Sequence, residues 1–186
     1  MKKTILLLLV ALLPLCVYGQ SIQTKFYGLK IGKKYSPDRV KEVLRNESDT
    51  KKYGIYKNEN GLNVEVESVS FGGHTWQAVA CSLLPSNNRL YSVWFLDGYD
   101  NDFAHAILLL SEMASKLKAK YGEGYFEAKD NSASCAYQWT DSNGMSIQLK
   151  LDDVTLDDEH TKHWVTLRYV DLNLMKQLST SSLDEL

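Results

Sequence analysis

The sequence predicts an α+β fold, in which two helix–three-strand repeats stand in tandem and form one antiparallel sheet with helices on one face. Three observations lead to this prediction. Residues 102–121 keep a helical hydrophobic spacing for about five turns. Alternating apolar and polar residues, typical of strands, flank that helix on both sides, and the order of one helix followed by three strands occurs twice. Helices that alternate with hairpin-connected strands are typical of an antiparallel sheet covered by helices.

The first repeat opens with a helix whose start is marked by three residues. Ser36 can cap the helix, Pro37 suits its first position, and Asp38 favours its positive end. Val40 and Leu44 then fall on the inward side. Strands are expected at residues 62–66, 75–84 and 90–96, with a further short strand at 53–56 and turns at 72–73 and 85–88.

The long helix opens the second repeat. Its apolar face carries Phe103, Ala106 and Leu110, Asp102 or Asn101 can cap its start, and Gly122 ends it. Strands are then expected at residues 133–140, 145–151 and 163–170, with a possible short strand at 126–128, a hairpin turn at 141–144, an acidic loop at 152–162 and a short helix at 172–178.

These elements divide the chain into four parts. We expect a signal peptide at residues 1–19, the first repeat at 20–98, the second repeat at 99–178 and a polar tail at 179–186. Residues 90–97 can be laid beside 164–171, and 40–44 beside 106–110, which suggests an internal duplication.

The first nineteen residues resemble a secretory signal. Lys2 and Lys3 form a positive end, an apolar run follows, and small residues before Gln20 provide a cleavage site after Gly19. The apolar run is short for a bilayer-spanning helix. Lipid attachment at Cys16 is the alternative, although Leu15 is large for the position before a lipidated cysteine. We therefore expect a periplasmic or secreted protein without an integral membrane segment.

The charge balance argues against nucleic acid as a partner. The whole chain carries a formal charge of −2, and removing Lys2 and Lys3 leaves nineteen basic against twenty-three acidic residues. Binding to a phosphate backbone requires clustered Lys and Arg, which a mildly acidic chain does not provide.

Signal cleavage would leave two cysteines, Cys81 and Cys135, one in each repeat. An even number of cysteines in an oxidising compartment permits one disulfide. Two separate buried thiols that behave as small hydrophobes are the alternative. The sequence leaves both open.

Motifs for catalysis are absent from the sequence. It contains no Gly-x-Ser-x-Gly, no phosphate-binding glycine loop and no cysteine with a protease signature, so we expect no catalytic residues and no cofactor. The nearest approach to a metal site is His160-Thr-Lys-His163 beside acidic residues 157–159. Zinc needs three or four converging ligands, so a metal-dependent periplasmic hydrolase at His160 and His163 is kept only as an alternative function.

Aromatic residues are the remaining functional signal. The chain has eleven Tyr, four Trp and five Phe, and many of them lie in or beside the expected strands. Exposed Tyr and Trp on a rigid sheet are good recognition anchors. Our candidate binding residues are therefore Trp76, Tyr91, Trp94, Trp139 and Trp164.

One short stretch resembles known envelope proteins. Gly28-Leu-Lys-Ile-Gly32, followed by Ser36-Pro-Asp-Arg-Val40 and Leu44, is similar to the opening of SmpA/OmlA-type outer-membrane lipoproteins and β-lactamase inhibitor proteins. The resemblance covers about twenty residues and otherwise only the element order. It implies tandem helix–three-strand units and the binding of a protein partner without catalysis. No contact residue of the inhibitors can be carried over.

Together these observations predict an exported, non-catalytic module that binds a protein or a cell-envelope component through an aromatic-bearing sheet face. The alternatives are the metal-dependent hydrolase and a protein that holds a small lipid or sugar between helix and sheet.

Overall fold

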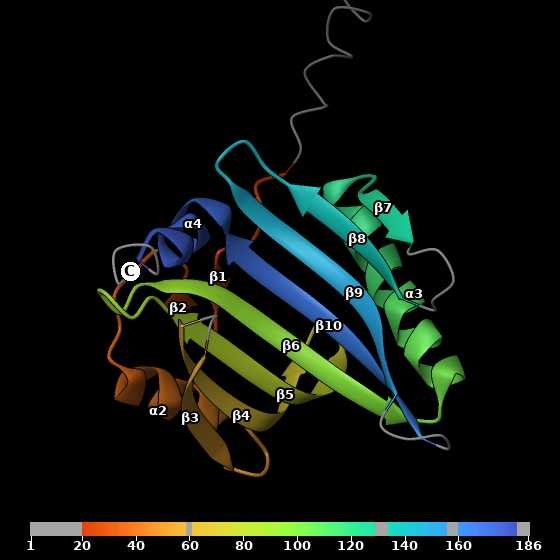
Figure 1. The fold of residues 1–186 in the computed structure, drawn as a ribbon, viewed down its shortest axis with the longest axis horizontal. Helices are drawn as coiled ribbons and strands as arrows, with labels where there is room; N and C mark the ends of the chain where they lie inside the picture. Colours follow the sequence, from red (N-terminus) through yellow and green to blue (C-terminus); the bar gives the residue numbers. More distant parts are fainter. Residues whose placement is uncertain (1–19, 59–60, 129–133, 156–159, 182–186) are drawn as a thin grey trace, which may run out of the picture.

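The computed structural model describes residues 20–58, 61–128, 134–155 and 160–181. The expected signal peptide, with Cys16, lies outside these residues. In the described part the fold is α+β, with a large antiparallel sheet and three helices, as the sequence predicts at that level (Figure 1).

Each half of the chain supplies one helix and four strands. The first half holds α2 (Pro37–Glu47), β3 (Tyr53–Asn58), β4 (Gly61–Phe71), β5 (His74–Leu83) and β6 (Leu90–Asp100). The second holds α3 (Phe103–Tyr121), β7 (Tyr125–Ala128), β8 (Cys135–Thr140), β9 (Met145–Thr155) and β10 (Thr161–Asp171), followed by α4 (Leu172–Ser181). A two-residue pair, β1 (Lys25–Phe26) and β2 (Leu29–Lys30), precedes α2.

The eight strands of the main sheet lie in the order β3-β4-β5-β6-β10-β9-β8-β7. Each half is therefore a meander, and the halves meet where β6 pairs with β10 in the centre of the sheet (Figure 1). Because this central pair is long and fully registered, from Lys162 opposite Asp100 to Val170 opposite Ser92, the sheet is continuous across the boundary between the expected repeats.

Two expectations about the strands need correction. Each half of the chain contributes four strands to the sheet rather than three, since the short strands expected at 53–56 and 126–128 form β3 and β7 and pair as its two edges. The acidic stretch at 152–155 is strand rather than loop: Asp152 lies opposite Trp164 and Asp153 opposite His163 on β10. Cross-strand partners at these two positions outweigh the low strand propensity of aspartate.

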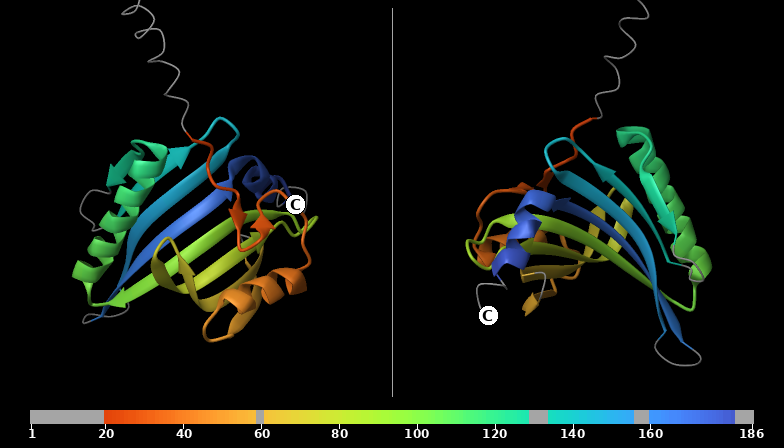
Figure 2. Two further views of the ribbon diagram at one scale, coloured as in Figure 1. Left: turned by 180° about the vertical axis from the view of Figure 1, so that it is seen from behind. Right: turned by 45° about the horizontal axis from the view of Figure 1, so that its top comes forward.

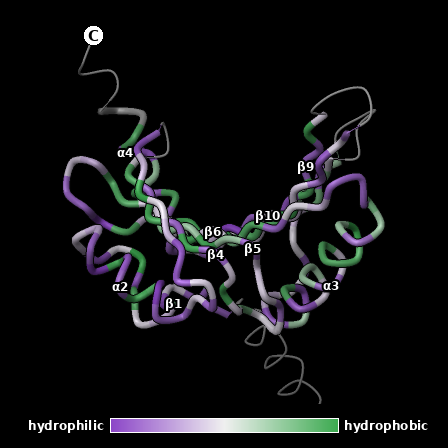
Figure 3. Tube along the Cα trace, turned by 90° about the horizontal axis from the view of Figure 1, so that it is seen from below, coloured by the Kyte–Doolittle hydropathy of each residue, from purple (hydrophilic) through white to green (hydrophobic). Residues whose placement is uncertain are grey.

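The sheet separates two different layers. Figures 2 and 3 show α2, α3 and the β1–β2 pair on one side of the sheet, whereas α4 stands on the other side. The α4 helix thus departs from the expected arrangement of helices on a single face. Figure 3 also shows that the ends of the sheet rise on the side away from α2 and α3, so that this side is concave. We call the concave side the trough.

Helix boundaries follow the cap residues of the sequence. Ser36 accepts a hydrogen bond from the Arg39 amide and Pro37 is the first residue of α2. Asp102 accepts from the His105 amide at the start of α3, and Gly122 closes its end with a φ of 82°, which favours glycine. The predicted start of α2 and both predicted limits of α3 are confirmed.

The main core lies between the sheet and the two helices. Alternate strand residues such as Val66, Phe95, Leu149 and Leu167 are buried there. Phe71 stacks on Phe95 with ring centroids 4.2 Å apart. Apolar burial of this extent supplies most of the free energy that holds α2 and α3 on the sheet.

A second, smaller cluster holds α4. It consists of Leu84, Tyr91, Val170 and Leu174. Tyr91 belongs to it because the β5–β6 register shifts between Ser82 and Leu83, so that Leu90 turns into the main core and Tyr91 turns towards α4. A β-bulge of this kind reverses the faces that simple alternation assigns.

Cys81 and Cys135 are free thiols. Cys81 lies on β5 and Cys135 on β8, with β6, β10 and β9 between them. At about 4.8 Å per strand they are about 19 Å apart across the sheet, whereas a disulfide needs Cα atoms within about 7 Å. The disulfide alternative is therefore wrong for this fold.

No helix within the described ranges has the length and hydropathy needed to cross a membrane.

Candidate functional site

The floor of the trough is formed by side chains on neighbouring strands in matched register. One cross-strand row consists of Trp94 on β6, Arg168 on β10, Gln148 on β9 and Gln138 on β8. The next row consists of Leu96, Thr166, Lys150 and Ala136. Side chains in such rows lie about 5 Å from their cross-strand neighbours, so they form a continuous surface.

Trp94 is fixed in place by buried polar groups beneath it. Its indole Nε1 donates to the Ser82 hydroxyl at 3.1 Å, and Ser82 donates to the Asn63 side-chain oxygen at 2.6 Å. Ser82 and Asn63 are both buried, whereas part of Trp94 remains exposed. A buried donor that has its acceptor is held in one geometry, so Trp94 is a rigid aromatic surface.

Arg168 covers Trp94 from the neighbouring strand. Its guanidinium carbon lies 4.0 Å from the centroid of the Trp94 ring, a cation–π distance. The Arg168 Nε donates to the Ser92 hydroxyl at 3.0 Å, and only 9% of the residue is exposed. Burial lowers the pKa of Arg168, and the neighbouring Tyr91 hydroxyl opposes that shift. The guanidinium nevertheless stays charged at neutral pH.

Trp164 forms a second aromatic element at the other end of β10. It lies against Gly98, where an added Cβ would come within 2.9 Å of the ring atom Cζ3. The Lys162 ammonium lies 4.6 Å from the ring centroid and also pairs with Asp100 at 3.5 Å. Gly98 therefore lets the indole lie flat across the neighbouring strand, with a cation above it.

Two hollows open from this surface. One, of about 100 Å³, is lined by Trp94, Gln148, Lys150, Asp152, Thr166 and Arg168. The other, of about 170 Å³, continues it towards β8 and shares Gln148, Lys150 and Asp152. A separate half-open hollow of about 610 Å³ lies where residues 20–22 meet Tyr121, Tyr125 and the end of β8. The two trough hollows combine an aromatic wall with both donors and acceptors.

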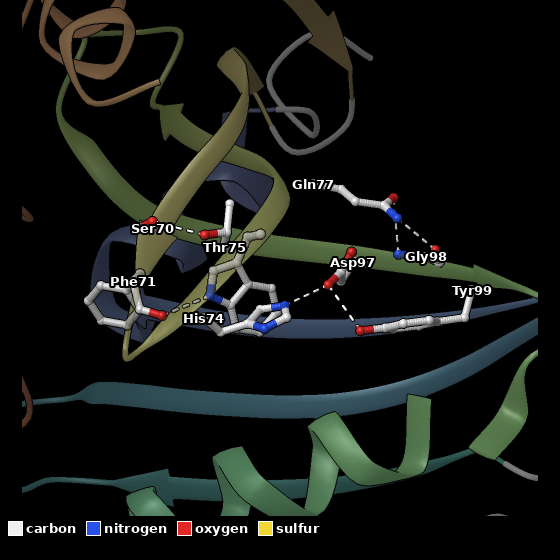
Figure 4. Close-up of polar contacts among 9 residues, drawn as sticks. Ser70, Phe71, His74, Thr75, Gln77, Asp97, Gly98 and Tyr99 are labelled. Atoms are coloured by element: carbon white, nitrogen blue, oxygen red, sulfur yellow. Dashed lines mark hydrogen bonds and ion pairs between the residues drawn. The ribbon is translucent and has the colours of Figure 1, made fainter. Parts of the chain in front are cut away.

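A polar cluster on the helix side joins β5 to β6 (Figure 4). The β5–β6 ladder stops at Ala78 and Leu96, and beyond it the Gln77 amide bonds both the N–H and the carbonyl of Gly98, at 3.2 and 2.8 Å. Side-chain hydrogen bonds thus replace backbone pairing where the two strands separate.

His74 is the second part of this cluster. Its Nε2 lies 2.7 Å from an Asp97 carboxylate oxygen, which also accepts from the Tyr99 hydroxyl at 3.1 Å (Figure 4). Burial and the Asp97 charge raise the pKa of Tyr99 to about 12, so Tyr99 remains a donor at neutral pH. In the described part of the chain no serine, threonine or cysteine side chain hydrogen-bonds to His74. The contacts of Asp97 with His74 and Tyr99 join the start of β5 to the end of β6.

His160 and His163, the candidate ligands of the alternative metal site, lie in different environments. His163 is buried on the helix side, with Nδ1 2.6 Å from an Asp153 oxygen and its ring edge-on to Phe103 at 5.4 Å. His160 is exposed just before β10, and residues 157–159 lie outside the described residues. Among the described residues no group of three or more His, Cys, Asp and Glu side chains is arranged to hold a metal ion.

The structure divides the five candidate aromatic residues into two groups. Trp94 and Trp164 lie in the trough and are partly exposed. Trp76 and Tyr91 are fully buried, and Trp139 is 5% exposed with its Nε1 bonded to the Gly122 carbonyl. Trp76 and Trp139 belong to the main core cluster and Tyr91 to the cluster beneath α4, so these three side chains expose almost no surface to a partner.

Sequence reasoning missed Arg168 and the buried hydroxyls. Alternation along 163–170 places Arg168 on the same face as Trp164, which was a usable signal. The Ser82–Asn63 and Ser92–Arg168 contacts join residues 19 and 76 positions apart, and no local pattern reveals such pairs.

Comparisons of the chain with protein-family models, curated proteins and solved structures found no match.

Proposed function

We propose that this protein is an exported, non-catalytic binding module that recognises a protein or cell-envelope component through the trough. The observation that carries this proposal is the partly exposed Trp94 ring on the concave side of the sheet, beside α4. Ser82 holds the indole, and the buried Arg168, which donates to Ser92 and to Met175 of α4, lies against it. Trp and Arg are the residues that most often dominate binding energy at protein interfaces.

Preorganisation is the physical reason that favours recognition. Trp94 and Arg168 are already ordered by hydrogen bonds, so a partner would not have to immobilise them. Trp164, fixed over Gly98, would add a second anchor on the same face. The concave shape in Figure 3 suits a convex partner such as a protruding loop.

Export and internal duplication belong to the same proposal. The resemblance of residues 28–44 to envelope proteins and the apolar run of the first nineteen residues support export. Duplication is supported by the order of one helix and four strands in both halves and by the meeting of the halves at β6 and β10.

The test is to block the floor of the trough without disturbing the core. Ala78 is partly exposed on β5 opposite Leu96, so Ala78→Arg would place a long side chain over the floor. Ala104→Arg on the exposed side of α3 makes the same chemical change elsewhere. Each mature protein would be used for cross-linking in a cell-envelope extract, with the captured partner identified by mass spectrometry.

The expected result is a specific partner that is captured by the wild type and by Ala104→Arg and is lost, at least about tenfold in affinity, with Ala78→Arg. Circular dichroism would establish that all three proteins fold. A partner that binds the Ala78→Arg variant with unchanged affinity would contradict the proposal.

A further inference from the structure

Exposed apolar side chains are concentrated on the two edge strands of the sheet. Within the described residues, eight large hydrophobic residues are exposed, and five of them lie on β3 or β7. These five are Tyr53 (50%), Ile55 (42%), Tyr56 (42%), Tyr125 (69%) and Phe126 (49%). Large apolar side chains on an unpaired strand are a marked site for strand addition.

The two edges have opposite strand directions. Every neighbouring pair in the order from β3 to β7 is antiparallel, and there are seven such pairs. A second copy placed beside the first in the same orientation therefore sets its β3 antiparallel to β7 of the first. The alternation of strand directions then continues through the joint without interruption.

One cross-strand row ends in an aromatic residue at each edge of the sheet. On the helix side one apolar row crosses the whole sheet: Tyr53, Val66, Val79, Phe95, Leu167, Leu149, Tyr137 and Phe126. Phe126 of one copy would thus meet Tyr53 of the next copy. Aromatic cross-strand pairs are among the more favourable ones in antiparallel sheets.

Charge also distinguishes the two edges. Lys52 and Lys57 flank or lie on β3, whereas Glu123 and Glu127 flank or lie on β7. One cross-strand row runs through Thr166, Lys150 and Ala136 and ends at Glu127 on β7. At the other edge of the sheet the same row begins at Lys52. Lys52 lies beside Glu67 and forms an ion pair with it at 3.3 Å. With Phe126 opposite Tyr53, the next pair in the joint is Glu127 opposite Lys52, a favourable cross-strand charge pair.

We propose that the chain self-associates by pairing β7 of one copy with β3 of the next. Pairing of β3 with β3 would bring lysines together, and pairing of β7 with β7 would bring glutamates together. The joint is heterologous, so each added copy leaves a free β3 at one end and a free β7 at the other, and repeated joints build open chains or, where the rotation between copies closes, a ring. The trough would continue from copy to copy.

The test measures self-association of the purified protein by sedimentation velocity, up to about 1 mM. Lys52→Glu alone and Glu127→Lys alone each place like charges in the joint, and we expect each to weaken association about tenfold. The double variant Lys52→Glu/Glu127→Lys restores opposite charges and should return to the wild-type affinity. Lys30→Glu, at the exposed position of β2, is the control, with no expected change.

Three outcomes would overturn the proposal. The first is a wild type that stays monomeric over the whole concentration range. The second is association that Glu127→Lys leaves unchanged, which would indicate a joint without β7. The third is a double variant as weak as the single ones. Because no other partner is present, failure here leaves the proposed function of the trough untouched.

Discussion

The two faces of the sheet are made from alternate residues of the same strands, yet they are held together differently. On the helix side the row through Phe95 and Leu167 is apolar from edge to edge. On the trough side the adjacent row passes through Trp94, Arg168, Gln148 and Gln138 and depends on buried hydroxyls beneath it. The helix side is stabilised by burial of apolar area. On the trough side an apolar cluster lies only beneath α4, and the open row depends on hydrogen bonds and a cation–π contact.

This difference assigns separate tasks to the faces. Close packing on the helix side provides the stability of the fold, and small losses of volume there are costly. The trough contributes less to stability, because Trp94, Leu96 and Trp164 remain partly exposed. A surface that is rigid but only partly buried is suited to recognition, and the following changes test the contrast.

The largest expected effect comes from a pair of neighbours on β6. Phe95→Ala removes a fully buried ring and should cost about 3–5 kcal/mol of unfolding free energy. Leu96→Ala, on the opposite face and partly exposed, should cost about 1 kcal/mol. Urea denaturation measures both, and equal losses would show that the two faces are not distinct in packing.

The next effect concerns two glycines that lie under indole rings. A Cβ at Gly124 would come within 2.5 Å of Trp139 Cε2, and Trp139 is buried, so Gly124→Ala should cost about 1–3 kcal/mol. A Cβ at Gly98 meets the partly exposed Trp164 and the flexible end of Lys162. Gly98→Ala should therefore cost less and instead alter tryptophan fluorescence. A larger loss of unfolding free energy for Gly98→Ala than for Gly124→Ala would contradict the difference in packing between the two faces.

The cation that covers Trp94 should contribute moderately. Arg168→Met keeps the aliphatic contact but removes the bond to Ser92 and the cation–π contact, and we expect a loss of about 1–2 kcal/mol. Lys162→Met removes the more exposed cation above Trp164 and should cost no more than about 0.5 kcal/mol. Equal effects of the two substitutions on thermal unfolding would mean that burial does not strengthen the Arg168 contact.

The smallest expected effect is an alkaline loss of stability that originates on the helix side. Burial raises the pKa of the Cys81 thiol to about 12 from its ordinary 9.0. A raised folded-state pKa gives stability that is complete below about pH 9 and falls as the pH rises towards 12. At pH 10 the loss is about 1 kcal/mol.

Urea midpoints at pH 8 and pH 10 measure the total alkaline loss, to which buried tyrosines such as Tyr99 and Tyr169 also contribute. Cys81→Ala should make that loss smaller than in the wild type by about 1 kcal/mol. Cys135→Ala is the control, because Cys135 is only partly buried. A thiol reagent at pH 8 should label Cys135 in the folded protein and Cys81 only after unfolding. Rapid labelling of Cys81 would contradict the burial on which this prediction depends.

Much of the local structure was predictable because its signals are local. The Ser36-Pro37 start of α2 and the Asp102 cap of α3 specify hydrogen bonds within one helical turn. The strand at 152–155 was missed, and the short strand expected at 53–56 extends to Asn58, because pairing partners decide such limits. The stretch from Asp152 to Thr155 is a strand only through its pairing with β10, and β3 is a strand only through its pairing with β4.

The candidate site was less predictable. Alternation assigns Trp94 and Phe95 to opposite faces, but it does not indicate which face the helices cover. Because alternation could not separate covered from open positions, three of the five proposed aromatic anchors, Trp76, Tyr91 and Trp139, proved to be buried. The missed members, Arg168 and Ser82, gain their roles from contacts with strands far away in the sequence.

The sequence by itself determined the α+β class, the start of α2, the limits of α3 and the two-faced character of the strands, since caps and hydrophobic periodicity act over a few residues. Only the tertiary structure decided that β6 meets β10 and that a bulge turns Tyr91 towards α4. The tertiary structure also decided that Trp94 and Trp164 both lie in the trough. These features depend on strand register and on where the helices dock, and both minimise the free energy of the whole sheet rather than of any segment.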